Sequence, residues 1–239
     1  MNKGIGLNRM ILLPWLDAAA ELRLQSNDLA AMRQGLQTVV SRDLHGTDAI
    51  RKSVDILVNI WNKSAAVHPG LHSNALLLLP AIPSRQRIWL HYGLTLLYYP
   101  FFRQCAAVLG QYGRIGESIP GKVIKERLAT ELGQYGSLNR SARYVVASLW
   151  HWGVLSYSSK GHLYTPKMQS FTSGTSELEI WLLSCALQAH PAEELTVANL
   201  LRLPELFPFK FTISLDHLRK NPRLVIQRQG SWDMIRLKE

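Results

Sequence analysis

Apolar residues recur at helical spacing along most of the first 97 residues, which predicts a block of helices. Ser26 is expected to cap a helix over 27–41, and Thr47 to cap the next one. Pro69, with the glycine after it, interrupts the pattern and predicts a loop over 65–73. The apolar positions of the two helices are Leu29, Met32, Leu36, Val40, Ile50, Val54, Leu57, Val58 and Trp61.

The most apolar stretch, 88–110, is rich in leucine and aromatic residues. His91, Pro100 and Arg103 interrupt it, so no uncharged run reaches the roughly 18–20 residues that a membrane-spanning helix needs. We therefore expect two buried helices that meet at Pro100, and no membrane segment. The aromatic side chains around the junction are expected to lie in the core, the alternative being that they stack on single-stranded bases. They are Tyr98, Tyr99, Phe101 and Phe102.

Residues 119–166 carry the clearest local signature, a helix-turn-helix followed by a β-hairpin. Ile119 and Pro120 are expected to open the first helix, because proline fits the first helical turn, where its missing N–H costs nothing. Gly133 is expected to end that helix, and a glycine-containing turn over 134–136 reverses the chain. The apolar face of the helix is Val123, Ile124, Leu128 and Leu132.

The second helix is expected to be capped by Ser137 or Asn139 and to run to Trp152, with Gly153 ending it. Two short strands, joined by a turn over 158–161, complete the hairpin. The buried face of the second helix is formed by apolar residues at helical spacing, namely Ala142, Val145, Val146 and Leu149.

The opposite face of this second helix is predicted to contact DNA. Its candidate residues are Asn139, Arg140, Arg143 and Tyr144. Arginine and asparagine can bond bidentately to base edges, and the N-terminal residues of the second helix of a helix-turn-helix enter the major groove. In the hairpin, Lys160 at the tip and His162 in the return strand are predicted to lie along phosphates or the minor groove. The alternative is a solvated helix face and a charged turn without a partner.

The remaining aromatic and histidine residues of this region are interpreted as structural. Trp150 and Trp152 are expected to anchor the hairpin in the core, and not to stack on bases. His151 and His162 are expected at the surface or at caps, and not as metal ligands.

The polar, uncharged segment 169–175 predicts a domain boundary. It separates a helical block (1–97) and a first unit (98–168) from a second unit (176–239). The second unit shows the same predicted order, three helices and then a hairpin around a glycine. Its exposed basic residues are Lys210, Arg219, Lys220, Arg223 and Arg228. These are further DNA-binding candidates.

The charge of the chain favours a polyanionic partner. Lys and Arg total 27 against 17 Asp and Glu, a formal net charge of +10. Residues 98–168 hold nine basic and three acidic residues, a net charge of +6, so the excess is largest on the unit with the helix-turn-helix. Nucleic acid is the first expectation and an anionic membrane surface the second.

Catalytic and metal-binding patterns are not found. The two cysteines, Cys105 and Cys185, lie in apolar helical patterns without a CxxC pair or a nearby histidine cluster, and predict buried thiols. Phosphate-binding, hydrolase and zinc-protease motifs are missing too. We therefore expect no enzyme activity, no cofactor and no metal, and, since no signal-peptide pattern opens the sequence, a cytoplasmic protein.

The element order from Tyr98 to Leu237 resembles that of tandem winged-helix DNA-binding proteins, with Leu149–Leu155 similar to their helix-to-wing junction. Leu90–Gly93, followed by Tyr99–Arg103 and the first unit, also resembles the small DNA-binding accessory subunit of BREX-type phage-defence systems of prokaryotes. This resemblance implies antiviral defence, with sequence-tolerant DNA binding in support of larger methyltransferase and ATPase partners.

The sequence thus predicts a mainly α fold, with an N-terminal helical block followed by two winged-helix units. The predicted function is non-enzymatic binding of double-stranded DNA with low sequence specificity. Two alternatives stay open. One is a protein-interaction subunit of an ATPase or methyltransferase complex, similar to the tandem winged helices that bind kleisin linkers. The other is a winged-helix transcriptional regulator.

Overall fold

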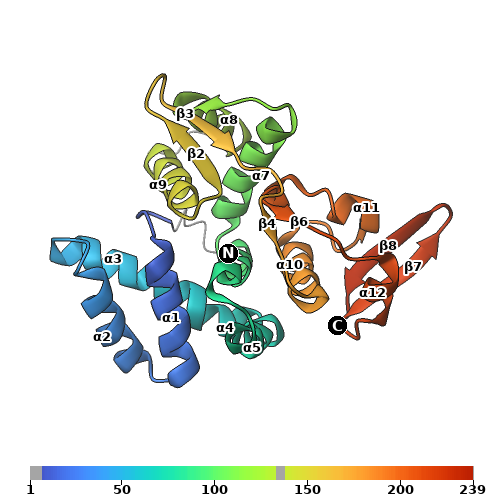
Figure 1. The fold of residues 1–239 in the computed structure, drawn as a ribbon, viewed down its shortest axis with the longest axis horizontal. Coiled ribbons are helices and arrows are strands. Elements are labelled where there is room, and N and C mark those ends of the chain that lie inside the picture. Colours follow the sequence, from blue (N-terminus) through green and yellow to red (C-terminus); the bar gives the residue numbers. More distant parts are fainter. Residues whose placement is uncertain (1–6, 133–137, 239) are drawn as a thin grey trace.

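The computed structural model describes residues 7–132 and 138–238, and this part of the chain is mainly helical, as predicted. The helices of the helical block pack together at one end of the molecule (Figure 1). They are α1 (Leu13–Gln25), α2 (Leu29–Val40), α3 (Thr47–Val58), α4 (Ser64–Val67), α5 (Pro69–Leu78) and α6 (Arg87–Tyr98), with a π-helical segment at Asn59–Lys63 and 3₁₀ turns at Leu79–Ala81 and Ser84–Gln86.

Two helices of the block begin differently from the prediction. Asp28, and not Ser26, caps α2, because its carboxylate accepts hydrogen bonds from the backbone N–H groups of Ala30 (2.8 Å) and Ala31 (3.3 Å). Thr47 is the first residue of α3 and not its cap.

The loop predicted over 65–73 is wrong, because most of this segment belongs to α4 and α5. Pro69 is the first residue of α5. Proline is well tolerated there, since the first N–H groups of a helix have no partner within the helix. The proline therefore starts a helix and does not mark a loop.

Helices α6 and α7 (Pro100–Arg114) meet at Pro100, as the sequence predicts. Every residue of α6 from Ile88 to Leu97 is buried. The helix packs against α1 on one side and against α10 (Ser176–Ala189) on another, which explains why it is apolar all round. No helix in the described ranges is long and apolar enough to cross a membrane.

The first unit consists of α7, two further helices and a three-stranded sheet, at the top of Figure 1. Its elements after α7 are β1 (Ile119–Pro120), α8 (Gly121–Leu132), α9 (Leu138–His151), β2 (Leu155–Ser158) and β3 (Leu163–Pro166). β1 pairs antiparallel with β3, which pairs antiparallel with β2, so the sheet order is β1-β3-β2.

Two local predictions for the first unit are corrected. Ile119 and Pro120 form a strand, and α8 starts only at Gly121. Asn139 is the second residue of α9 and therefore not its cap. The predicted helix end at Gly133, the turn over 134–136 and the alternative cap Ser137 lie outside the described residues.

Helix α9 ends at His151, one residue before the predicted end, and Gly153 terminates it as predicted. Gly153 has a φ of 77°, in the left-handed region that favours glycine. The backbone N–H of Val154 donates to the Leu149 carbonyl at 2.9 Å, which satisfies an acceptor at the end of the helix. The chain then enters β2 and the hairpin.

The second unit has a similar order, with a 3₁₀ turn and a strand added between its second and third helices. After α10 come β5 (Leu195–Thr196), α11 (Val197–Leu200), a 3₁₀ turn (Pro204–Leu206), β6 (Phe209–Lys210), α12 (Leu215–Lys220), β7 (Leu224–Gln229) and β8 (Trp232–Leu237). β8 pairs antiparallel with both β5 and β7, so the sheet order is β5-β8-β7. In both units the sheet places its third strand between the first and the second.

The segment predicted as a linker, 169–175, is bonded to the second unit. It contains β4 (Phe171–Thr172), which pairs in parallel with β6. The backbone N–H groups of Gln169 and Phe171 donate to the carbonyls of Phe207 and Pro208, at 2.8 Å and 2.9 Å. The segment is therefore held in place along its length.

Buried side chains from the helical block and both units form one hydrophobic core. The rings of Trp89 and Tyr92 on α6 pack against Phe209 of β6, with centroids 4.5 Å and 4.9 Å apart. Tyr92 also packs against Phe102 of α7, at 5.1 Å. The aromatic cluster at the α6–α7 junction thus lies in the core as predicted: Tyr99, Phe101 and Phe102 are buried, and Tyr98 is partly buried.

Candidate nucleic-acid interface

The exposed face of α9 carries the predicted reading residues. Asn139, Arg140 and Arg143 are exposed, and Tyr144 is half-buried. The opposite face is buried in the core through Ala142, Val145, Val146 and Leu149. Helical spacing alone predicts which side chains of α9 are exposed and which are buried, and the structure agrees with that prediction.

A hollow of about 340 Å³ lies between the start of α8, α9 and the hairpin of β2 and β3. Among the residues of the described chain that line it, the charged side chains are Lys122, Lys125 and Arg143, and no carboxylate takes part. His162 of the hairpin lines the hollow too. Three cations therefore flank the hollow, while Ile124, Ala142 and Val146 give it an apolar floor.

The hairpin presents Lys160 and His162 to solvent, as predicted. His162 has a φ of 50°, the left-handed conformation that histidine adopts more readily than most residues. Its Nδ1 lies 2.7 Å from the hydroxyl of Tyr157, within hydrogen-bond distance. Tyr157 is paired across the hairpin with Tyr164, which lines the hollow, so the orientation of His162 is fixed by the strands.

The two tryptophans near the end of α9 behave differently. Trp152 is an anchor, as predicted: it is buried, and its Nε1–H donates to the Ile11 carbonyl at 2.9 Å. The prediction for Trp150 is wrong, because this side chain is 41% exposed. Its ring lies 4.6 Å from that of His151 and 5.5 Å from that of Tyr157, measured between centroids. Trp150 therefore extends the exposed face of α9 towards the hairpin.

The cations of the exposed face are not neutralised by the neighbouring carboxylates. The ion pairs of α8 join Lys122 to Glu126 (3.6 Å) and Arg127 to Glu131 (3.1 Å), both at exposed positions. Within the described ranges no carboxylate lies within 4.0 Å of the predicted cations of α9 and the hairpin, which are Arg140, Arg143 and Lys160. Their positive charge is available to a ligand.

The candidates of the second unit are arranged less favourably. Arg219 and Arg228 share one carboxylate, that of Asp233, at 3.1 Å and 3.6 Å. Arg223 donates to the side chain of Asn74 on α5, at 2.5 Å. Lys210 and Lys220 are exposed at the ends of β6 and α12. The structure does not gather these five side chains around one hollow, so the first unit holds the stronger candidate interface.

Sequence reasoning missed Lys122 and Lys125. They follow the Pro120–Gly121 pair and lie one turn apart at the start of α8, so the signal was a basic first turn after a proline. Phosphates are favoured at helix N-termini, which makes these positions suitable for contacts to a nucleic-acid backbone.

No group of three or more His, Cys, Asp or Glu side chains in the described part of the chain is placed to hold a metal ion. Cys105 and Cys185 are buried, as predicted, and burial raises the pKa of both thiols. A thiol with a raised pKa is a poor nucleophile at neutral pH.

Comparisons of the chain with protein-family models, curated proteins and solved structures gave no match. The resemblances to tandem winged-helix proteins and to the BREX-type accessory subunit therefore stay predictions.

Proposed function

We propose that this chain is a non-enzymatic protein that binds double-stranded DNA with low sequence specificity, through the first unit. The observation that carries the proposal is the hollow between α8, α9 and the hairpin, where Lys122, Lys125 and Arg143 gather without a carboxylate in its lining, as far as the chain is described. Such a surface attracts the phosphate backbone of a duplex.

The element order of the first unit supports the proposal. Helix, strand, two helices and a hairpin, with the sheet order β1-β3-β2, is the arrangement expected of a winged-helix unit. In this arrangement α9 is the reading helix. An α-helix with its side chains is about 10–12 Å wide and fits the major groove, which is about 12 Å wide.

Each exposed group then has a role in duplex binding. Asn139, Arg140 and Arg143 face the base edges and phosphates of the major groove. Lys122 and Lys125 contact phosphates beside the groove, and Lys160 at the hairpin tip follows the backbone or the minor groove. Most of these groups are cations suited to phosphate, which favours affinity over sequence discrimination.

The biological setting we propose, an accessory role in a BREX-like phage-defence system with methyltransferase or ATPase partners, rests on the sequence resemblance alone. A protein-interaction subunit is the second candidate function. It is favoured by Trp232, which begins β8 next to the turn of the second hairpin and is 60% exposed. Exposed tryptophans are frequent anchors of protein interfaces.

A double variant, Arg140→Ala with Arg143→Ala, tests the proposal. Each phosphate contact contributes about 0.9 to the slope of log affinity against log salt, or about fivefold in affinity at about 0.15 M salt. Losing two contacts should weaken binding to a duplex of about 20 base pairs by about 30-fold and lower the slope by about 1.8. Fluorescence anisotropy over a salt series measures both.

The matched control removes two cations of the second unit, Arg202 and Lys238, both exposed, by alanine substitution. It changes the net charge equally and should keep most of the affinity. Circular dichroism establishes that both variants are folded. If the α9 variant is folded and binds the duplex as tightly as the control variant, the proposed interface is wrong.

A further inference from the structure

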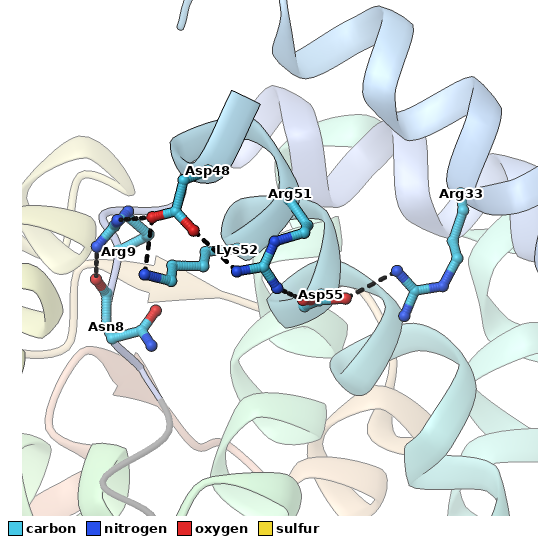
Figure 2. A network of polar contacts seen from close by, with 7 residues as sticks. All are labelled: Asn8, Arg9, Arg33, Asp48, Arg51, Lys52 and Asp55. Carbon is cyan, nitrogen blue, oxygen red and sulfur yellow. Dashed lines mark hydrogen bonds and ion pairs between the residues drawn. The ribbon is translucent and has the colours of Figure 1, made fainter. Parts of the chain in front are cut away.

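A row of charged side chains crosses the helical block beside α9 (Figure 2). Asp48 of α3 accepts from Arg51 at 2.8 Å and Lys52 at 2.7 Å, and it also pairs with Arg9 at 3.2 Å. The row continues because Arg51 reaches Asp55 at 3.4 Å, and Asp55 pairs with Arg33 of α2 at 2.7 Å. Four cations thus surround two carboxylates, which leaves two positive charges in excess.

Arg9 joins this row to the reading helix. Its guanidinium carbon lies 5.9 Å from the ring centroid of Tyr144 on α9, and that of Arg143 lies 5.7 Å from the same centroid. The segment that carries Arg9 is fixed to α9, because the backbone N–H of Ile11 donates to the Ser148 hydroxyl at 2.9 Å. Arg9 therefore connects the charged row to the side of α9 that carries Arg143 and Tyr144.

The row of ion pairs is better suited to binding a phosphate backbone than to stabilising the fold. Exposed ion pairs contribute little to folding. The side chain of Arg51 is 61% exposed and that of Arg33 is 38% exposed, so both guanidinium groups keep N–H donors for a ligand. Asp48 and Asp55 hold these side chains in place, which lowers the entropy lost when a phosphate binds.

The Asp48 carboxylate remains charged in this arrangement. Hydrogen bonds from Lys52 and Arg51 lower the pKa of Asp48. The Asp48 carboxylate repels a phosphate while it orients the arginines. In Asp48→Asn the side-chain oxygen still accepts a hydrogen bond but the negative charge is lost, so DNA affinity should rise.

We propose that the DNA-binding surface continues from α9 over Arg9 onto α3 and α2, so that Arg51, Lys52 and Arg33 contact the backbone of the same duplex. The inference rests on the proposed function, since it extends that interface. A helix of 12 residues such as α3 is about 18 Å long, which matches about five base pairs of duplex. The contacts should therefore need a duplex longer than the part covered by α9 and the hairpin.

The experiment compares duplexes of about 10 and about 20 base pairs, since one helical turn spans about 10 base pairs. The double variant Arg33→Ala, Arg51→Ala should weaken binding to the longer duplex by about 30-fold at about 0.15 M salt, with little effect on the shorter one. Its control is again the second-unit variant of Arg202 and Lys238.

A second variant should change the DNA affinity in the opposite direction. Asp48→Asn should strengthen binding to the longer duplex by about fivefold, the effect of one phosphate contact. Its control is Glu193→Gln, an exposed position in the second unit that loses the same charge.

A loss from the double variant or a gain from Asp48→Asn, confined to the longer duplex, supports the inference. It is overturned if both variants match their controls on both duplexes while the variant of Arg140 and Arg143 still weakens binding. If that α9 variant also binds normally, the proposed function itself fails.

Discussion

Among the described glycines, Gly110 on α7 should be the one least able to accept a side chain. A Cβ built at this position would lie 1.9 Å from the carbonyl oxygen of Pro204 and 2.7 Å from its carbonyl carbon. Both atoms are backbone, so relief needs a shift of the chain by more than about 1 Å. The segment cannot move freely, because Glu205 pairs with Arg103 at 3.2 Å and its carbonyl accepts from the Tyr92 hydroxyl at 2.6 Å.

The expected cost of Gly110→Ala follows from this geometry. Overpacking a rigid core lowers the free energy of unfolding by about 1–3 kcal/mol. Because the added methyl group would meet fixed backbone atoms, we expect a value near 3 kcal/mol, the upper end of this range. For a chain of this size about 1 kcal/mol lowers the Tm by about 2–4 °C, so we expect a decrease of about 6–12 °C. Thermal unfolding followed by circular dichroism measures it.

Gly70→Ala is the matched control. Nothing lies within 4 Å of a Cβ at this position, which is the second residue of α5. Alanine is favoured over glycine in a helix by up to about 1 kcal/mol, so the control should unfold at the same or a higher temperature. Equal unfolding temperatures for the two variants would refute the close packing of α7 on the second unit.

Two further predictions concern buried polar groups. The Nδ1 atom of His91 accepts a hydrogen bond from Trp61, its Nε2 lies 2.9 Å from Asp17, and burial lowers the pKa of the imidazole. Below about pH 6.5 the folded state therefore binds fewer protons than the unfolded state. The free energy of unfolding should fall with acidification, by at most about 1.4 kcal/mol per pH unit. Urea unfolding at pH 7.5 and 5.5 should show this decrease, and His91→Gln should reduce it; an equal decrease in the variant would exclude His91 as its source. Glu179 is buried and accepts four hydrogen bonds, two of them from backbone N–H groups at 2.8 and 3.0 Å. Glu179→Gln should therefore lower the free energy of unfolding by about 1–3 kcal/mol, measured by thermal unfolding, whereas the exposed control Glu177→Gln should change it little. Equal stability of these two glutamine variants would contradict the role assigned to the buried carboxylate.

Sequence reasoning succeeded where one residue fixes the backbone. Pro100 divides the long apolar stretch into α6 and α7, and Gly153 ends α9 with a left-handed φ. It failed for β1 and β5, which have two residues each and no periodicity. Ile119 becomes a strand only because Tyr164 lies beside it in the folded chain. Such pairing is set by tertiary contacts and not by local propensity.

The candidate site was predictable in part. Arg140 and Arg143 follow from helical spacing. The same spacing predicts that Trp150 and Trp152 are not both buried, because residues two apart on a helix do not face the same side. The approach of Arg9 to α9 depends on the tertiary fold, and no local pattern in the sequence indicates it.

The central claim is that the first unit binds duplex DNA by neutralising phosphates, and the salt dependence of binding tests it most directly. Five cations are assigned to phosphates, namely Lys122, Lys125, Arg140, Arg143 and Lys160. They predict a slope of log affinity against log salt of about −4.5 on a duplex of about 10 base pairs, or about a 500-fold loss between about 50 and 200 mM salt. Absence of binding at the lowest salt, or an affinity that does not change with salt, would contradict the account.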